Sequence, residues 1–232
     1  MEISLVLPAY QEAENLKKIL PRLHSVLKSM EVDYEILIVD TMEPMDDTPK
    51  ICDENNAVYL PRYGGNLYGD AIRTGFERAA GTYTVVMDAD GSHSPEDIAR
   101  MYMQMQAEAY DLVIGSRYCK GGYTDNNFVL RLMSRVLNMT YRTVFHLKVQ
   151  DVSDSFRMYR TEHLKKLKLE CSNFDIVEEI LIKLNLLCDP MKVKEIPISF
   201  NKRDEGKSKR SLIKFIFSYM KTMRRLSAIK NR

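Results

Sequence analysis

The chain has 232 residues, of which 45% are hydrophobic and 28% charged, and its formal net charge is +2. This length and composition allow one substantial core, which excludes a disordered or fibrous protein and favours one large domain over two small ones. No run of eighteen apolar residues occurs and the N-terminus lacks the features of a signal peptide, so we expect a cytoplasmic protein. The four cysteines have no CxxC spacing, which predicts reduced thiols rather than disulfides or a zinc site.

Short apolar runs alternate with helical patterns through the first half of the chain. Two amphipathic stretches predict helices over residues 12–30 and 94–109, the second with Ser94 as N-cap and Pro95 at its first position. Five runs rich in β-branched residues predict strands over 3–8, 34–40, 57–61, 82–88 and 110–116. This alternation predicts an α/β fold with a mostly parallel sheet and helices on both of its faces.

After residue 116 the pattern changes but contains no repeat or low-complexity linker. Residues 126–147 and 176–187 have a helical pattern, whereas 155–160 and 192–200 read as strands. We therefore expect the second half to complete the same domain, up to about residue 210.

Positive charge is concentrated at the C-terminus. Residues 201–232 contain eleven Lys and Arg and two acids, a local charge of +9, while the rest of the chain carries −7. Within this segment, residues 211–232 mix apolar and basic side chains and predict an amphipathic helix that lies on an anionic membrane surface at its cytoplasmic face. The basic residues occupy this one tail and are not interleaved with aromatic residues on a sheet face, so we expect no nucleic-acid partner.

Carboxylates follow two of the predicted strands. Asp40 ends the second strand, and Asp88 and Asp90 follow the fourth. In parallel sheets, ligands bind at the carboxyl ends of the strands. Two acids at positions i and i+2 can share Mg²⁺ or Mn²⁺, although an isolated pair of this kind is more often a set of surplus acids before a helix. His93 beside them is a possible ligand or base, but a lone histidine in such a loop is more often structural.

The motifs around these acids resemble glycosyltransferase family 2, and most closely its polyprenyl-phosphate sugar transferases of the dolichol-phosphate mannose synthase type. The matching stretches, in chain order, are "VLPAYQEAENL", "EILIVD", "GDAIRTGFERAAGTYTVVMDADGSHSPEDI", "DLVIGSRY", "DSFRMYR" and "RDEGKSKRS". The resemblance implies the GT-A fold. It also implies inverting transfer of a hexose, mannose or another, from GDP-mannose or a UDP-sugar to a polyprenyl or dolichyl phosphate.

The resemblance also assigns roles to individual residues. It implies that Asp88 and Asp90 hold Mg²⁺ or Mn²⁺, which neutralises the diphosphate as it leaves. Arg203 and Lys209 match the late motif, where cations contact phosphate oxygens. The implied nucleotide-sugar contacts are Pro8, Tyr10, Glu12, Asp40, Asp88 and Arg117. The implied catalytic residues are Asp90, Asp154, Arg203 and Lys209.

Three positions depart from the family pattern. Thr41 replaces the second acid after the second strand, Ser92 stands where close relatives carry a metal-binding glutamine, and Asp154 replaces a small neutral residue. An acceptor phosphate attacks without a base, whereas a sugar hydroxyl needs one. Asp154 is therefore either a base for a glycan hydroxyl or a structural acid that pairs with Arg157 or caps a turn. We favour the phosphate acceptor. A catalytically silent scaffold, supported by Thr41, is a further alternative.

Overall fold

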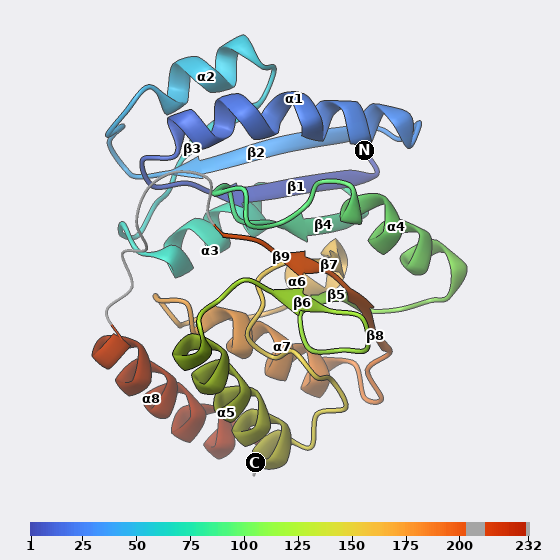
Figure 1. The fold of residues 1–232 in the computed structure, drawn as a ribbon, viewed down its shortest axis with the longest axis vertical. Helices are drawn as coiled ribbons and strands as arrows, with labels where there is room; N and C mark the ends of the chain where they lie inside the picture. Colours follow the sequence, from blue (N-terminus) through green and yellow to red (C-terminus); the bar gives the residue numbers. More distant parts are fainter. Residues whose placement is uncertain (203–211, 231–232) are drawn as a thin grey trace.

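The computed structural model describes residues 1–202 and 212–230, with side-chain environments through residue 202 and from 218 to 228. Its centre is a seven-stranded sheet in the order β3-β2-β1-β4-β7-β5-β8 (Figure 1). The sheet consists of β1 (Ile3–Pro8), β2 (Tyr34–Asp40), β3 (Val58–Pro61), β4 (Tyr83–Val86), β5 (Leu112–Ser116), β7 (Arg157–Arg160) and β8 (Val193–Pro197). The predicted α/β fold with a mostly parallel sheet is confirmed.

The first four strands are parallel because each connection between them contains a helix. In the register of the sheet, Ile3 lies opposite Tyr34 on one side and Tyr83 on the other. The connecting helices are α1 (Ala13–Ser29), α2 (Thr48–Glu54) and α3 (Tyr68–Arg78). All four strands therefore point their carboxyl ends toward the same edge of the sheet.

Two of these helices were not predicted, and α3 shows why. It contains Gly69 and Gly75, which lower helix propensity. A Cβ at Gly69 would clash with the carbonyl oxygen of Cys171, and one at Gly75 would clash with the side chain of Val6. The glycines thus permit close packing of α3 on the sheet and on the segment around Cys171, a tertiary requirement that weakens the local helical signal.

The helix α4 (Asp97–Ala107) begins later than predicted. Ser94 is not its N-cap: its hydroxyl donates to Glu96 Oε2 at 2.7 Å, and no side chain caps the helix. The carbonyls of Ser94 and Pro95 instead accept from the N–H groups of Asp97 and Ile98, which makes a tight turn before the helix. The prediction placed the first turn of the helix in this turn, so its boundary was wrong by two residues.

The second half of the chain adds strands in an order that the linear pattern did not indicate. The strand β7 inserts between β4 and β5 and runs antiparallel to both, and β8 then pairs in parallel with β5. The predicted strand over 192–200 is divided, because after Pro197 the chain leaves the main sheet. Its end forms β9 (Ser199–Phe200), which pairs in parallel with β6 (Tyr123–Thr124) in a separate two-stranded sheet.

Helices cover both faces of the sheet, as predicted. On one face, α1, α2 and α4 pack on apolar side chains of β1, such as Leu5 and Leu7. On the other face lie α3, α5 (Phe128–Phe145), α6 (Thr161–Leu164), α7 (Ile176–Leu187) and α8 (Leu212–Lys230). Figure 1 shows α5 and α8 side by side at the end of the molecule opposite α1 and α2. Tyr219 and Leu226 of α8 are buried in this layer.

Among the described residues, none of the helices combines the length and the apolar character that a membrane span requires. The predicted domain boundary at residue 210 lies outside the described residues, so it stays a prediction.

Candidate active site

The predicted polar residues gather at the carboxyl edge of the parallel strands. Pro8 is the last residue of β1 and Asp40 the last residue of β2, while Asp88 lies two residues beyond the end of β4. Because β1 lies between β2 and β4 with matched register, these positions are neighbours at one edge of the sheet. The acids, which are distant in sequence, therefore lie along one edge of the sheet, with the end of β1 between Asp40 and Asp88.

Asp40 is fully buried and only partly satisfied. Its Oδ1 is 3.5 Å from the hydroxyl of Thr41, and its Oδ2 has no hydrogen-bond partner among the described residues. Burial raises the pKa of this carboxyl. Thr41 donates its stronger hydrogen bond, at 2.6 Å, to the carbonyl oxygen of Glu43. A buried carboxylate oxygen without a partner is costly, so this atom is suited to accept a hydrogen bond from a ligand.

Arg62, which the sequence analysis did not identify, holds this edge together. Its buried guanidinium donates to the backbone carbonyls of Ala9, Asp40 and Leu67, and so joins the ends of β1 and β2 to the loop before α3. The sequence feature that could have identified Arg62 is its position directly after β3 (Val58–Pro61), at the same edge of the sheet. Arginine suits this task because its planar guanidinium carries several donors in a fixed geometry.

The turn after β1 places the predicted Tyr10 and Glu12 differently. Tyr10 is 37% exposed, whereas Glu12 is buried and accepts a hydrogen bond from Asn15 Nδ2 at 2.5 Å. Between them, Gln11 has a φ of 57°, so the backbone turns sharply before α1. Tyr10 is therefore partly exposed at the edge, while Glu12 is part of the turn.

The two acids of the DxD motif have different surroundings. Asp88 is half-buried and accepts from the hydroxyl of Tyr68 at 3.3 Å. Asp90 is buried, and its Oδ1 accepts from the backbone N–H of Ser92 at 3.0 Å and from its hydroxyl at 2.6 Å. Ser92, which replaces the family's glutamine, thus orients the second acid. These carboxylates offer the hard oxygen donors that Mg²⁺ and Mn²⁺ prefer.

His93 connects the DxD loop to the loop before β7. Its Nδ1 accepts from the backbone N–H of Asp88 at 3.4 Å, and its Nε2 lies 3.1 Å from Asp154 Oδ1. The ring also stacks on Phe156, with ring centroids 4.9 Å apart. Both ring nitrogens have protein partners, so His93 acts as a structural link between the two loops rather than as a metal ligand.

Asp154 and Arg117 form a buried network with Asp151. Arg117 makes a two-point contact with Asp151, from Nε to Oδ2 and from a terminal nitrogen to Oδ1, both at 2.8 Å. Its Nε also lies 2.9 Å from Asp154 Oδ2. That second contact is an ion pair without hydrogen-bond alignment, because the Nε–H points toward Asp151. Asp154 therefore pairs with Arg117 and with His93, whereas Arg157 donates to the backbone carbonyls of Val152 and Val177.

This network shifts the pKa values of Asp154 and His93. Burial alone would raise the pKa of Asp154, but Arg117 and His93 outweigh it and hold the pKa well below the usual range. Burial would likewise lower the pKa of His93, and the carboxylate of Asp154 raises it instead. A carboxylate with a depressed pKa is a weak proton acceptor.

Arg203 and Lys209 are outside the described residues, so their proposed phosphate contacts stay predictions.

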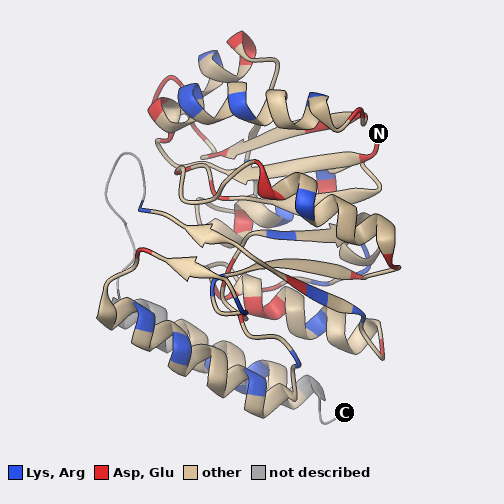
Figure 2. Cartoon of the chain, turned by 45° about the vertical axis from the view of Figure 1, so that its right-hand side comes forward, with Lys and Arg blue, Asp and Glu red and all other residues tan. Residues whose placement is uncertain are grey.

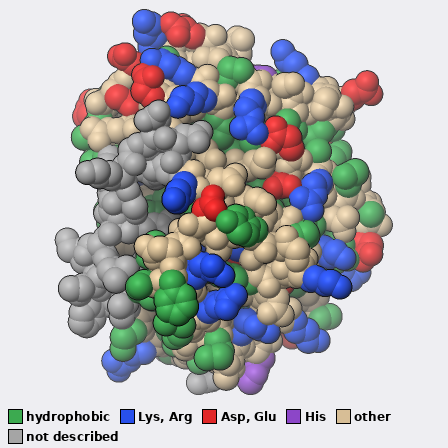
Figure 3. All heavy atoms as spheres, viewed as in Figure 1, with side chains coloured by type: hydrophobic (Ala, Val, Ile, Leu, Met, Phe, Trp, Pro, Cys, Tyr) green, Lys and Arg blue, Asp and Glu red, His purple; other side chains and the backbone are tan. Residues whose placement is uncertain are grey.

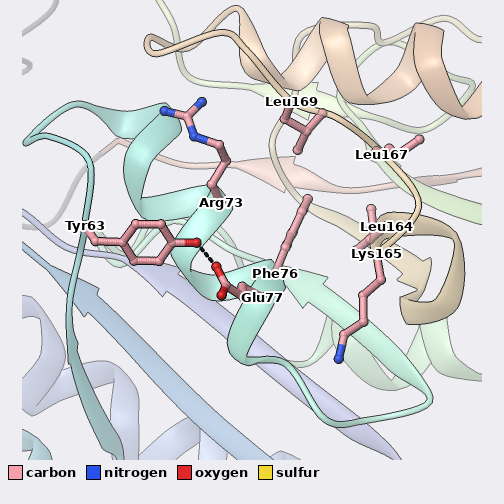
Figure 4. A pocket seen from close by; sticks show the side chains of 8 residues that line it. All are labelled: Tyr63, Arg73, Phe76, Glu77, Leu164, Lys165, Leu167 and Leu169. Atoms are coloured by element: carbon pink, nitrogen blue, oxygen red, sulfur yellow. Dashed lines mark hydrogen bonds between the residues drawn. The ribbon is translucent and has the colours of Figure 1, made fainter.

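A pocket of about 380 Å³ opens beside α3, away from the DxD loop. Figure 4 shows its lining: Tyr63 is hydrogen-bonded to Glu77 on one side, and leucines from α6 and the segment after it lie on the other. Of the predicted site residues that the structure describes, none lines it.

Comparisons with known proteins agree with this arrangement. The chain is 34% identical over 234 residues to a dolichol-phosphate mannosyltransferase of Pyrococcus furiosus. The alignment covers 97% of this chain and 64% of that protein. It is 32% identical over 217 residues to a polyprenol monophosphomannose synthase of Mycolicibacterium smegmatis, which covers 89% of this chain and 80% of that protein. The chain thus spans slightly less than two thirds of the length of the first relative.

Solved structures share the fold at lower sequence identity. Glucosyl-3-phosphoglycerate synthase from Mycobacterium tuberculosis, in complex with Mn²⁺, uridine diphosphate and phosphoglyceric acid, superposes with a TM-score of 0.75 at 17% identity. The match covers 97% of this chain and 78% of that one. Residues 4–168 match the family described as "Glycosyl transferase family 2". With its parallel sheet and the acids at its carboxyl edge, the chain belongs to glycosyl transferase family 2.

Proposed function

We propose that this protein is an inverting, nucleotide-sugar-dependent glycosyltransferase that moves a hexose, with mannose the first candidate, to a polyprenyl phosphate. The observation that carries the proposal is that Asp88 and Asp90 lie at the same sheet edge as Asp40, whose buried Oδ2 has no hydrogen-bond partner among the described residues. The names of the two curated relatives support mannose and a polyprenyl acceptor.

The donor is proposed to bind along this edge, from β2 to β4. Asp40 Oδ2 would accept an N–H of the base, and Tyr10 and Pro8 would flank the nucleoside. Asp88 and Asp90 would hold Mg²⁺ or Mn²⁺, which when bound neutralises charge on the leaving diphosphate. The complexes of the structural neighbour with Mn²⁺ or Mg²⁺ and uridine diphosphate support the use of a divalent cation. Arg117 would act on the donor indirectly, since its guanidinium is engaged by Asp151 and Asp154.

The acceptor is proposed to be a phosphate rather than a hydroxyl. A hydroxyl nucleophile needs a base, and the departure from the family pattern at Asp154 suggested one. In its buried network, Asp154 has a depressed pKa and contacts to both Arg117 and His93. These contacts favour a positioning role, in which Asp154 holds the loop before β7 against the DxD loop. A phosphate acceptor is already ionised and needs no such base.

One face of α5 combines exposed apolar and basic side chains, which supports the proposal that the protein binds to a membrane surface. Phe128, Leu132, Val136 and Met139 recur at helical spacing on one side of the helix and are each at least half exposed. Basic residues border this stripe at positions 131, 135 and 142. Figure 2 shows Lys and Arg on the ribbon in the lower part of the molecule, and Figure 3 shows Lys and Arg beside hydrophobic side chains there, over α5. We propose that this α5 face binds anionic lipid and presents the edge of the sheet to a lipid acceptor.

A donor panel tests the transferase proposal. Purified protein with Mg²⁺, a polyprenyl phosphate in detergent and GDP-mannose, UDP-glucose or UDP-N-acetylglucosamine should yield one glycosylated lipid by mass spectrometry. Asp90→Ala serves as the inactive control. Nucleotide binding without transfer or hydrolysis of any donor would instead favour the scaffold alternative.

Vesicle binding tests the α5 face separately. Removal of the C-terminal segment would also remove the buried Tyr219 and Leu226, so point variants are the better probe. Replacement of both Arg131 and Arg135 by Ala should weaken binding to anionic vesicles roughly 30-fold, at about 1 kcal/mol for each basic residue. Lys50→Ala removes one exposed basic side chain from α2, at the opposite end of the molecule, and is the control, with an expected loss well below that of the double variant (Figure 1). Equal losses in both variants would mean that the α5 face has no special role.

A further inference from the structure

A cluster of metal-ligating side chains lies away from the candidate active site. Asp111 directly precedes β5, His163 lies in α6, and Cys188 follows the last residue of α7. One oxygen, one nitrogen and one sulfur from these residues all lie within 4.8 Å of one another. The cluster is at the start of β5, whereas Arg117 follows its end, so the strand separates the two sites by roughly 20 Å.

The interatomic distances match a tetrahedral zinc site. His163 Nδ1 is 3.4 Å from Cys188 Sγ and 3.5 Å from Asp111 Oδ1. In tetrahedral coordination with ordinary Zn²⁺ bond lengths, sulfur and nitrogen ligands are about 3.6 Å apart, and nitrogen and oxygen ligands about 3.4 Å. A small movement of Asp111 relative to Cys188 would therefore complete three corners of a tetrahedron.

Protons alone satisfy the cluster poorly. If the thiol of Cys188 donates to His163 Nδ1, that nitrogen has no proton for Asp111, and its lone pair faces a carboxylate oxygen. If Nδ1 carries the proton instead, it can donate that proton to Cys188 Sγ or to Asp111 Oδ1 but not to both. A cation at the centre attracts all three ligand atoms at once. The mixture of sulfur, nitrogen and oxygen donors suits Zn²⁺ and does not suit Mg²⁺ or Ca²⁺.

The surrounding contacts hold each ligand in place. Asp111 Oδ2 accepts from the backbone N–H of Lys192 at 2.8 Å, which orients the other oxygen toward His163. His163 Nε2 lies 3.7 Å from Glu162, a carboxylate that favours a proton on Nε2 and leaves the Nδ1 lone pair for a metal. The side chains of Asp111 and His163 are each 16% exposed, so an ion has access from solvent.

From this geometry we infer that Asp111, His163 and Cys188 form a Zn²⁺ site with water as the fourth ligand. The ion would join the start of β5, α6 and the end of α7 at the edge of the sheet opposite the DxD motif. Its role is to stabilise this corner of the fold. The site is independent of the transferase proposal, because none of its ligands is among the residues assigned to the donor or acceptor.

Cobalt spectroscopy tests the site directly. Chelator-treated, desalted protein titrated with Co²⁺ should develop the intense visible bands of a four-coordinate ion and a thiolate-to-cobalt charge-transfer band, and Zn²⁺ should abolish both. Cys188→Ser should lose the charge-transfer band, while Cys119→Ser should retain it. Asp90→Ala should also retain it, because oxygen ligands at the DxD motif give no thiolate band. Glu162→Gln should weaken binding about 10-fold.

A second measurement uses the unmodified chain and so does not depend on the folding of a variant. Zn²⁺ should slow alkylation of Cys188 by iodoacetamide, measured by mass spectrometry, and leave the half-buried Cys119 as an unchanged internal reference. A thiol must lose its proton to bind Zn²⁺, so binding should tighten as pH rises. A wild-type protein without the thiolate band, a band that survives in Cys188→Ser, or equal alkylation with and without Zn²⁺ would overturn the inference.

Discussion

Replacement of Asp154 by Asn separates a catalytic base from a positioning residue. The amide oxygen of Asn can still accept from the N–H of Phe156, which donates to Asp154 Oδ1 at 2.9 Å, and from His93 Nε2. The substitution removes the negative charge 2.9 Å from Arg117 Nε, but Arg117 keeps its two-point contact with Asp151. Loss of this charged contact from the buried network should lower the free energy of unfolding by about 2 kcal/mol.

The effect on catalysis depends on the acceptor. If a lipid phosphate is the nucleophile, kcat of the Asn variant should be similar to that of wild type or higher, because a negative charge near an incoming anion is removed. If a glycan hydroxyl is the nucleophile, loss of the base should lower kcat by about 10²-fold to 10⁴-fold with little change in donor affinity. We expect the first result.

Two further measurements make the test specific. Asp151→Asn also removes a charge from Arg117 but leaves His93 and Asp154 in contact, so a loss of kcat shared by both variants reports disturbed positioning of Arg117. In wild type, the raised pKa of His93 gives stability that is present at acid pH and lost as pH rises through that pKa. The Asp154→Asn variant should therefore be more destabilised near pH 5.5 than near pH 8.5 in urea titrations. A kcat loss of 10²-fold or more in a folded Asp154→Asn protein, with Asp151→Asn unaffected, would refute the positioning role.

Three other outcomes are expected. Excess EDTA should abolish sugar transfer, added Mg²⁺ should restore it, and Asp90→Ala should lower kcat roughly 10²-fold or more; full turnover in EDTA would contradict the metal assignment. Burial raises the pKa of Glu178 from 4.5 to about 8, so the stability that its protonated form gives is fully present below pH 4.5 and lost as pH rises toward 8. Wild-type stability should then fall by about 1 kcal/mol per pH unit across this window relative to Glu178→Gln, and parallel pH profiles of unfolding would contradict this. Arg62→Lys should lower the free energy of unfolding by about 2 kcal/mol, because lysine cannot reach three backbone carbonyls at once; a melting temperature equal to wild type would show that Arg62 does not hold the edge.

Much of the fold and part of the candidate site could be predicted because their signals are local. The strands of the first half are short apolar runs, and α1 shows helical spacing of Leu16, Leu20 and Leu23, so the alternation of elements is readable along the chain. Once these strands are parallel, Asp40 and Asp88 must lie at one edge, since each follows the carboxyl end of its strand. The local pattern thus determined the α/β class and the edge at which the acids lie.

Only the tertiary structure decided which distant residues meet. The antiparallel insertion of β7 between β4 and β5 brings the loop before β7 to the DxD loop, and with it Asp154 to His93 and Arg117 rather than to Arg157. Such a partner is set by strand order, which depends on burial of the whole sheet and has no signature in the local sequence.

The cysteines show the same division. Their lack of CxxC spacing predicted reduced thiols, and all four are free. Spacing along the chain reveals a metal site only when its ligands are close in sequence. Asp111, His163 and Cys188 are separated by more than twenty residues at each step and meet because β5, α6 and α7 pack together. The sequence by itself determined the type of fold and the chemistry available at the ends of its strands, whereas long-range packing decided which side chains become partners.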